Sequence, residues 1–575
     1  MVTLQNLLCL HPVLLMLLWS TITTARFVTI SVDASQILGD WTPMNRFFGC
    51  DEPNFAYYPR GQELIEKLGA VSRSQTYFRT HNLLTTGHGN LVGVPALKWG
   101  STNAYTKGDD GKPVYDFTVV DRIFDAYLAR NVKPYVQVGF MPLGLATNPE
   151  PYFFEFNPDS AYNVIYTGWS HTPESYQAWE ELAYQWAAHC LEKYGENEVL
   201  SWYWEVWNEP NIAYWNGTIE EFYMLHDYAA AGIRRAIPQA RVGGCEVAGG
   251  AAGTYLNDFL THCLSGTNYA SGSIGTPLDF ISFHSKGLPS WINTTGSDGF
   301  VRMNVSTQLQ QIDEAFGVVA SFPEFKKTPI VMSEYDPDGC AACQTPAYGY
   351  RNGLLYPAYT AASFMRAVEL AQRRGINLEG ALTWAFEYEK TELLPDGDQY
   401  FEGFRVLSTM GIDKPVLNAH RLLGMISGQQ VQATSSGQTP LDVVLSDSVR
   451  GNETDVGAVA SVDENTAYMF VWHYHDDNLD FPDANVSLVV QGLPFSGQAS
   501  LTHWRVDDQH GNAYQRWIEM GSPQSPNEEQ YQQLVDAGKL ATLGEPQVVA
   551  VADAGIRLNF SLPIRSLSLI VLEKE

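Results

Sequence analysis

The decapeptide Trp202-Tyr203-Trp204-Glu205-Val206-Trp207-Asn208-Glu209-Pro210-Asn211 is the most informative part of this chain of 575 residues. Its first six residues are mostly aromatic and apolar and show no helical period, which predicts a buried strand. Asn208 and Glu209 then fall where that strand meets a loop, because Pro210 cannot continue the pairing. A carboxyl group walled by indole rings would lose hydration and have a raised pKa, the state that a general acid needs near neutral pH. The alternative for Glu209 is an ordinary glutamate in a surface loop.

The composition limits the class of protein. The length allows two or three domains, and 45% hydrophobic against 17% charged residues allows a large buried core. A formal net charge of −29 makes nucleic acid and anionic membrane surfaces poor partners. Aromatic residues make up 13% of the chain, which a large aromatic core would explain. Sugar-binding clefts also use aromatic faces, so this content supports a carbohydrate ligand without deciding for it.

Residues 1–25 predict a secretory signal peptide. They contain no Asp, Glu, Lys or Arg, Leu7–Ser20 is largely apolar, and Thr23-Thr24-Ala25 supplies small residues for a cleavage site. The apolar stretch is short for a membrane span, so an uncleaved anchor is the less favoured alternative, and no later segment approaches spanning length. We therefore expect a secreted, extracellular protein with no membrane contact. Six glycosylation sequons fit this expectation and begin at Asn216, Asn293, Asn304, Asn452, Asn485 and Asn559.

The cysteines predict no metal site. Cys9 would leave with the signal peptide, and six cysteines would remain. Cys340-x-x-Cys343 has no second Cys or His pair at ligand spacing, so a local disulfide or two free thiols is favoured over zinc. No cofactor is expected.

The order of candidate strands and helices predicts an α/β fold with a (β/α)8 TIM barrel over residues 45–427. After residue 428 the texture changes to short strands separated by polar turns, which predicts an accessory C-terminal β-sandwich over residues 428–575. Residues 26–44 contain an alternating strand that we expect to join this sandwich. The expected barrel strands are Phe47–Cys50, Thr76–Arg79, Lys133–Gly139, Trp202–Trp207, Arg241–Gly244, Leu278–Phe283, Pro329–Ser333 and Gly380–Trp384.

Two carboxyl groups at strand ends form a candidate catalytic pair. In such barrels the chemistry lies at the carboxyl ends of the strands. Glu209 ends the fourth expected strand, and Glu334 follows the seventh, Pro329–Ser333. A retaining glycosidase needs two carboxyl groups about 5–5.5 Å apart, one as acid/base and one as nucleophile. We therefore predict Glu209 as acid/base and Glu334 as nucleophile; the alternative for Glu334 is a structural carboxylate paired with an arginine.

Other side chains fall at or near the same strand ends and are candidates for substrate binding. A histidine at such a position is as often a hydrogen-bonded structural residue as a substrate contact. The expected substrate-binding residues are His81, Asn208, His284, Lys286 and Trp384.

From about Phe47 to its end, the chain resembles glycoside hydrolase family 39, which contains β-xylosidases and α-L-iduronidases. The resemblance is carried by Arg79-Thr80-His81, Glu205-Val206-Trp207-Asn208-Glu209-Pro210, Asp279-Phe280-Ile281-Ser282 and Lys414-Pro415, among other short motifs. It implies the same barrel with an accessory β-sandwich, and double displacement with Glu209 as acid/base and Glu334 as nucleophile.

Parts of the sequence look closer to the iduronidase branch. These include Ser282-Phe283-His284-Ser285-Lys286-Gly287 and Glu334-Tyr335-Asp336-Pro337. The arginine that iduronidases place near the substrate carboxylate has no clear match, because Gly403 occupies that position and Arg405 lies two residues on. Both β-xylosidase-like and α-L-iduronidase-like activity therefore stay open.

The expected function is that of a secreted, exo-acting retaining glycosidase with an oligosaccharide or polysaccharide substrate. One alternative is an endo-acting glycanase of the same family, since loop lengths decide between the two modes. Others are a non-catalytic carbohydrate-binding protein on the same barrel and a structural glycoprotein. The presence of both carboxyl groups favours the enzyme.

Overall fold

The computed structural model describes residues 26–87, 100–148, 168–294, 297–340, 343, 346–386, 400–403 and 405–575. The signal peptide predicted for residues 1–25 lies outside these residues, as do Glu387, Tyr388 and Glu389, which follow the last expected barrel strand. Among the helices that the structure describes, none is both long and apolar enough to cross a membrane.

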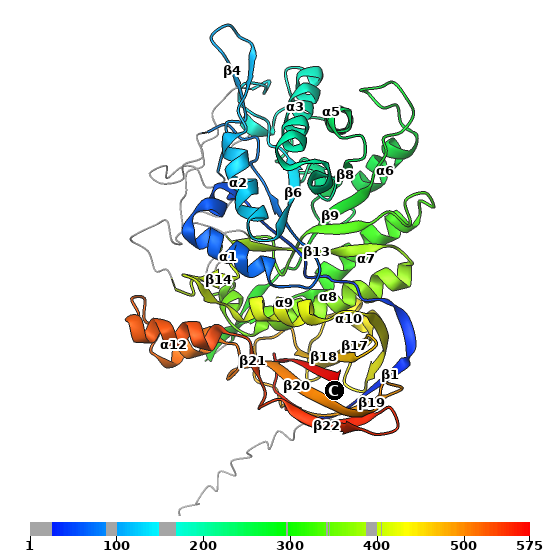
Figure 1. Cartoon of the computed structure of the whole chain (residues 1–575), viewed down its shortest axis with the longest axis vertical. Coiled ribbons are helices and arrows are strands. Elements are labelled where there is room, and N and C mark those ends of the chain that lie inside the picture. Colours follow the sequence, from blue (N-terminus) through cyan, green and yellow to red (C-terminus); the bar gives the residue numbers. More distant parts are fainter. Residues whose placement is uncertain are drawn as a thin grey trace, which may run out of the picture.

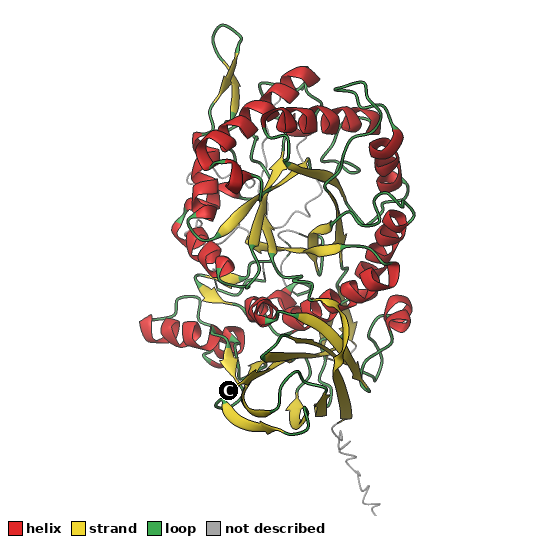
Figure 2. Cartoon of the chain, turned by 45° about the vertical axis from the view of Figure 1, so that its right-hand side comes forward, coloured by secondary structure: helices red, strands yellow, loops and turns green. Residues whose placement is uncertain are grey.

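The predicted (β/α)8 barrel is confirmed: eight parallel strands close on themselves inside a ring of helices (Figure 2). The strands are β2 (Phe47–Cys50), β3 (Thr76–Thr80), β6 (Val132–Val138), β7 (Tyr203–Val206), β8 (Arg241–Val247), β9 (Phe280–Lys286), β12 (Ile330–Asp336) and β13 (Leu378–Phe386). The helices around them are α1 (Pro59–Gly69), α2 (Thr118–Leu128), α3 (Tyr176–Tyr194), α5 (Ile219–Ala236), α6 (Tyr255–Ser265), α7 (Val305–Ala320), α8 (Leu355–Arg374) and α9 (Pro415–Met425).

Several strands run further than their sequence predicts, and in two of them, β9 and β12, the extension carries residues of the expected site. The seventh strand was expected to end at Ser333 and the sixth at Phe283, but β12 continues to Asp336 and β9 to Lys286. The two extensions pair with each other, Glu334 beside His284 and Asp336 beside Lys286. Glu334 and Lys286 thus lie within strands and not after them. The sequence pattern did not predict these extensions, because charged side chains are typical of loops. In the folded barrel the charges of Glu334 and Lys286 are buried and paired.

Most of the aromatic content belongs to the core. The side chains of Trp179, Trp186, Trp202, Trp204 and Trp207 are buried completely. Inside the barrel, the ring of Tyr203 packs edge to face against Tyr77 and Phe280, and such contacts fill the barrel interior. The inner residues are Phe47, Tyr77, Tyr135, Tyr203, Phe280, Val331, Leu382 and Trp384.

The accessory domain lies against α8 and α9 of the barrel (Figure 1). Its strands are β1 (Arg26–Asp40), β16 (Gln429–Ser435), β17 (Asp455–Val462), β18 (Thr466–Tyr474), β19 (Ala484–Gln491), β20 (Gly497–Val506), β21 (Ala541–Thr542), β22 (Gln547–Val551), β23 (Ile556–Leu562) and β24 (Leu567–Lys574). The helices α10 (Leu441–Asp447), α11 (Ala513–Glu519) and α12 (Glu528–Gly538) accompany them.

These strands form one continuous mixed sheet, which confirms the predicted accessory β domain and gives it the form of a half-barrel. The long strand β1 joins the sheet, because it pairs antiparallel with β16 and parallel with β19. Irregular pairing between Asp33 and Ile37 lets β1 bend. Side chains from strands along the whole path then share one apolar core, as in a half-barrel.

Candidate active site

The barrel brings the two predicted catalytic carboxyl groups together at its carboxyl end. One oxygen of Glu209, one oxygen of Glu334 and a ring nitrogen of His284 all lie within 4.8 Å of one another. Glu334 is 5% exposed, so its carboxyl group is nearly enclosed. This proximity fits the carboxyl separation of about 5–5.5 Å that retention of configuration requires.

Backbone turns after β7 aim Glu209 into the site. Trp207 and Glu209 have φ angles of 75° and 44°, which side-chain-bearing residues adopt rarely and mostly where function requires it. The neighbouring strands hold these turns, because the Trp207 N–H donates to the carbonyl of Val138 at 3.1 Å. The Glu209 N–H donates to the carbonyl of Glu246 at 2.9 Å.

His284 connects the acid/base candidate to a buried carboxylate. Its Nδ1 lies 2.9 Å from Oε1 of Glu209, and its Nε2 lies 3.0 Å from Oε2 of Glu246. Burial disfavours the charged ring, but the carboxylates of Glu334, Glu209 and Glu246 outweigh it and raise the pKa of His284 to about 9. At neutral pH the ring is therefore an imidazolium that donates a hydrogen bond from each nitrogen.

Three cationic or polar groups surround the nucleophile candidate. Nζ of Lys286 lies 2.8 Å from Oε2 of Glu334, Nη1 of Arg79 lies 3.2 Å from Oε1, and Nε2 of His81 lies 3.4 Å from the same oxygen. Burial alone would raise the pKa of Glu334, but His284, Lys286 and His81 hold it well below the usual range. Glu334 is thus an ionised carboxylate at neutral pH, as a nucleophile must be.

Arg79 organises a second layer beneath these groups. Its guanidinium donates to Glu205, to Oε2 of Glu246 at 2.9 Å and to Oδ1 of Asn208 at 3.0 Å. Burial raises the pKa of Glu205, whereas Arg79 and His284 oppose burial and lower the pKa of Glu246. Since Arg79 holds the amide oxygen of Asn208, that side chain has a fixed orientation beside Glu209.

Trp384 and His81 form one wall of the site. The two rings pack edge to face with centroids 5.2 Å apart, and Nζ of Lys286 lies 5.9 Å from the centre of the Trp384 ring. Nδ1 of His81 lies 2.7 Å from Oδ1 of Asp51. All seven side chains predicted for the site thus converge at one end of the barrel.

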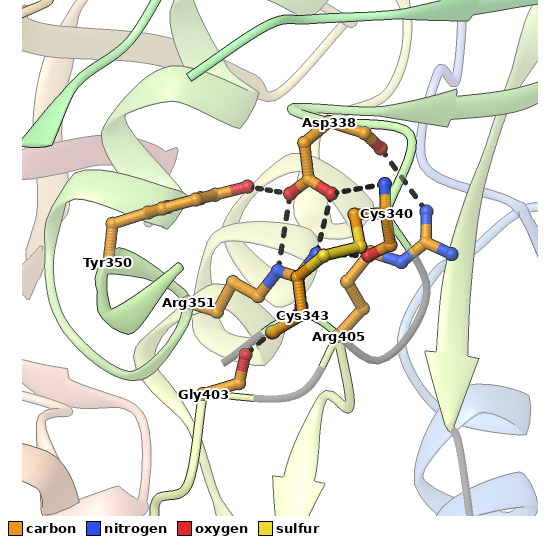
Figure 3. The surroundings of a disulfide bond; sticks show 7 residues. All are labelled: Asp338, Cys340, Cys343, Tyr350, Arg351, Gly403 and Arg405. Atoms are coloured by element: carbon orange, nitrogen blue, oxygen red, sulfur yellow. Dashed lines mark hydrogen bonds and ion pairs between the residues drawn. A yellow bond between two sulfur atoms is a disulfide. The ribbon is translucent and has the colours of Figure 1, made fainter. Parts of the chain in front are cut away.

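Asp336 joins two cations next to the nucleophile. Nζ of Lys286 lies 2.5 Å and Nη1 of Arg405 lies 3.2 Å from Oδ2 of Asp336. The Arg405 guanidinium also donates to the carbonyl of Asp338 at 3.2 Å (Figure 3). Arg405 therefore reaches the active site, although Gly403 occupies the position that iduronidases give to an arginine and Arg405 lies two residues further on.

A disulfide lies in the segment that follows β12. Cys340 is bonded to Cys343, so of the two alternatives, a local disulfide or two free thiols, the structure has the disulfide. The Arg351 guanidinium binds Oδ1 of Asp338 at 2.5 Å and the carbonyls of Cys340 at 2.5 Å and Cys343 at 3.1 Å (Figure 3). Among the described residues, Cys50, Cys190, Cys245 and Cys263 are buried and belong to no disulfide.

Several residues of the site had no predicted role. Glu205, Glu246, Asp51, Asp336 and Arg405 all take part in the network. Glu205 and Glu246 carried a usable signal, since a glutamate inside or just after an apolar strand needs a buried cationic partner. Arg405 carried only the signal of the family resemblance, since it lies two residues beyond Gly403.

The three groups Glu209, His284 and Glu334 are close enough together to hold a cation. However, Glu334 already faces the positive charges of Lys286 and Arg79, which would repel a metal ion. The donor set suits proton transfer and nucleophilic attack better than metal binding.

Comparison with known proteins places this geometry in context. A family model described as glycosyl hydrolases family 39 matches residues 85–546. A β-xylosidase of Caldicellulosiruptor saccharolyticus is 26% identical over 436 residues, which are 76% of this chain and 78% of that protein. An α-L-iduronidase of Mus musculus is 25% identical over 501 residues, 80% of this chain and 68% of that protein.

Solved structures share the fold. A monomeric β-xylosidase from Caulobacter crescentus superposes with a TM-score of 0.69 at 21% identity, covering 96% of this chain and 100% of that one. A bacterial orthologue of human α-L-iduronidase gives a TM-score of 0.74 at 18% identity and covers 96% and 84% of the two chains. At these identities the likeness concerns the fold.

Proposed function

The chain belongs to glycoside hydrolase family 39 and is a retaining glycosidase with a carbohydrate substrate, and from this premise we propose an exo-acting enzyme with Glu209 as acid/base and Glu334 as nucleophile. The observation that carries the proposal is the approach of Glu209, His284 and Glu334 to within 4.8 Å at the carboxyl end of the barrel. The burial of Glu334, which is 5% exposed and packs beside Lys286, supports attack on a terminal sugar.

The reaction proceeds in two displacements. Ionised Glu334 attacks the anomeric carbon while Glu209 gives its proton to the leaving oxygen, and a glycosyl ester forms on Glu334. The Nδ1–H of His284 then stabilises the negative charge that appears on Glu209. Glu209 next takes a proton from water, which attacks the ester and releases the sugar with its original configuration.

The sugar bound next to Glu334 is proposed to be a β-D-xyloside or an α-L-iduronide. Two cations, Lys286 and Arg405, converge on Asp336 beside the nucleophile, which favours a uronate. A neutral pentoside is the second candidate, because the ammonium of Lys286 already contacts two carboxylates. A screen of chromogenic β-xyloside, α-L-arabinoside, β-galactoside, β-glucoside and α-L-iduronide substrates, with product analysis on a polysaccharide, tests both the sugar and the exo mode.

The variant Lys286→Ala separates the two sugars. If Lys286 binds a carboxylate, kcat/KM for the uronoside should fall by roughly tenfold more than for the pentoside, since about 1.4 kcal/mol gives a factor of ten. Both substrates should also show a shifted pH profile. Lys286 lowers the pKa of Glu334, so its loss raises that pKa and moves the acidic limb of kcat/KM to higher pH.

Lys286→Arg is the matched control, because it keeps the positive charge beside Glu334. It should restore the acidic limb of the profile toward that of the unmodified enzyme. If Lys286→Ala lowers kcat/KM equally for the uronoside and the pentoside, Lys286 has no role in uronate binding. The pentoside is then the favoured substrate.

We propose further that the enzyme is secreted. The uncharged, apolar segment 1–25 supports this, as does the Cys340–Cys343 disulfide, which is typical of oxidising compartments. The sequon side chains of Asn216, Asn293 and Asn452 are exposed, so glycans could be attached there. The protein from culture medium should begin near residue 26 on amino-terminal sequencing; a chain that stays in the cell and begins at Met1 would contradict secretion.

A further inference from the structure

A cavity lies between the barrel and the accessory domain. Its volume is about 320 Å³, and its lining comes from the hairpin β10 (Ser290–Thr294) and β11 (Ser297–Arg302), the segment 346–355, and loops of the accessory domain. The hairpin follows β9 and the segment follows β12, so the cavity lies on the same face of the barrel as the catalytic groups.

The walls of this cavity combine aromatic rings with planar polar groups. Trp291, Phe300 and Tyr514 contribute partly exposed rings. Asn478, Asp508 and Arg565 contribute amide, carboxylate and guanidinium groups. Aromatic faces stack on the apolar face of a pyranose, and planar polar side chains can hydrogen-bond neighbouring hydroxyls, so the lining suits a sugar.

The cavity is held in shape by bonds between the two domains. Arg302 forms a two-pronged ion pair with Asp477 at 2.5 and 2.8 Å. The Asn478 N–H donates to the carbonyl of Val301 at 2.9 Å, which ties the hairpin to the accessory domain by its backbone. A ligand would therefore find the walls already in place and would lose little free energy in ordering them.

Glycines give two of the rings their positions. A Cβ on Gly299 would lie 2.6 Å from the indole of Trp291, and a Cβ on Gly353 would lie 3.3 Å from the ring of Tyr514. The Trp291 ring thus packs against backbone that only glycine leaves open, whereas the Tyr514 ring would have to move by a few tenths of an ångström to admit a Cβ at Gly353. Both glycines also line the cavity.

Charge in the cavity points to a neutral ligand. Asp508 and Arg565 bring opposite charges to the lining, and Arg565 also donates to the carbonyl of Leu479 at 2.7 Å and faces Asp480 at 3.6 Å. The carboxylate of Asp508 would repel an anionic sugar. Arg565 would compensate little, because it already shares its charge with other partners.

We propose that this cavity is a second saccharide-binding site, which takes a neutral pyranose unit of an oligosaccharide and lies apart from the catalytic carboxyl groups. Tyr350 lines it and donates to Asp338, whose carbonyl accepts from Arg405. A packed polar chain therefore runs from the cavity to the active site. The proposal rests on the chain being a glycosidase, but it does not require Glu209 and Glu334 to have the roles assigned above.

Direct binding tests the proposal. The variant Glu334→Gln is titrated with xylotetraose by calorimetry, alone and combined with Trp291→Ala or Tyr514→Ala. Removing either ring should weaken one binding event by roughly tenfold, the scale of a lost aromatic stacking contact. Phe27→Ala is the matched control, because Phe27 is 85% exposed on the accessory domain, outside the cavity, and its loss should leave binding unchanged.

Kinetics in the catalytically intact chain separate this site from the active site. Trp291→Ala should leave turnover of a small chromogenic glycoside unchanged and raise KM for the tetrasaccharide. Thermal unfolding checks that the variants remain folded. Binding of xylotetraose that is the same with and without the two rings, or no measurable binding to Glu334→Gln, would overturn the second site. The turnover of a small glycoside by Glu334→Ala tests a different point. It reports on the role of Glu334 in catalysis and not on the second site.

Discussion

Glu334→Ala is expected to lower kcat/KM by more than roughly 10⁴-fold on every glycoside that the enzyme cleaves, the scale seen when a nucleophile of a catalytic unit is removed. Without the carboxylate no glycosyl ester can form, and the side of the sugar that Glu334 occupied becomes open. A small anion such as azide can then enter this position. It would attack directly and release a glycosyl azide of inverted configuration, which NMR of the product identifies.

The rescued activity is also the control for folding. Glu334 helps to balance the charges of Lys286 and His284, so its loss removes one partner from each of these buried cations and should lower the melting temperature. Glu334→Gln keeps the shape and serves as the comparison. A glycosyl azide of retained configuration from Glu334→Ala would show that another residue is the nucleophile.

Glu209→Ala should fail in a different way. General acid catalysis contributes about 10²–10⁴-fold, and its loss matters most for leaving groups that must be protonated. Activity on a dinitrophenyl glycoside should therefore fall little in the glycosylation step, while activity on an alkyl glycoside or a disaccharide should fall by that whole factor. Azide should attack the glycosyl ester on Glu334 and give a product of retained configuration.

The dependence on leaving group is read from a series of aryl glycosides of graded phenol pKa. The slope of log kcat/KM against phenol pKa should be steeper in Glu209→Ala than in the unmodified enzyme. His284→Gln is a useful comparison, since it removes the imidazolium charge beside Oε1 of Glu209 and leaves the carboxyl group. An unchanged slope in Glu209→Ala, or the same product stereochemistry from both rescued variants, would contradict the division of roles.

Local sequence was enough to predict the barrel and its two central carboxyl groups. The apolar run that ends at Asn208, Glu209 and Pro210 predicts a strand and its end without reference to the rest of the chain. Eight such strands separated by helical patterns predict closure, and closure places all carboxyl ends on one face. The position of Glu334 near the end of another strand then implied that the two groups meet.

The surroundings of these groups depend on contacts between distant parts of the chain. Glu246 binds Arg79 and His284 from a strand of its own, and Arg405 reaches Asp336 from a loop. None of these pairs has a sequence spacing that predicts it. Their charges are tolerated in the interior only because each one meets its partner there.

The limits of the strands and the pairing in the accessory sheet also depend partly on local sequence and partly on contacts between distant residues. Polar residues at the ends of β9 and β12 predict loops, but pairing of Glu334 with His284 and of Asp336 with Lys286 extends both strands. The alternating pattern of β1 predicts a strand, whereas its two neighbours β16 and β19 come from the other end of the chain. Periodicity along the chain thus determined which segments are strands and which carboxyl groups end them. Only the tertiary structure decided their partners, because hydrogen bonds and ion pairs between strands join residues that the sequence holds far apart.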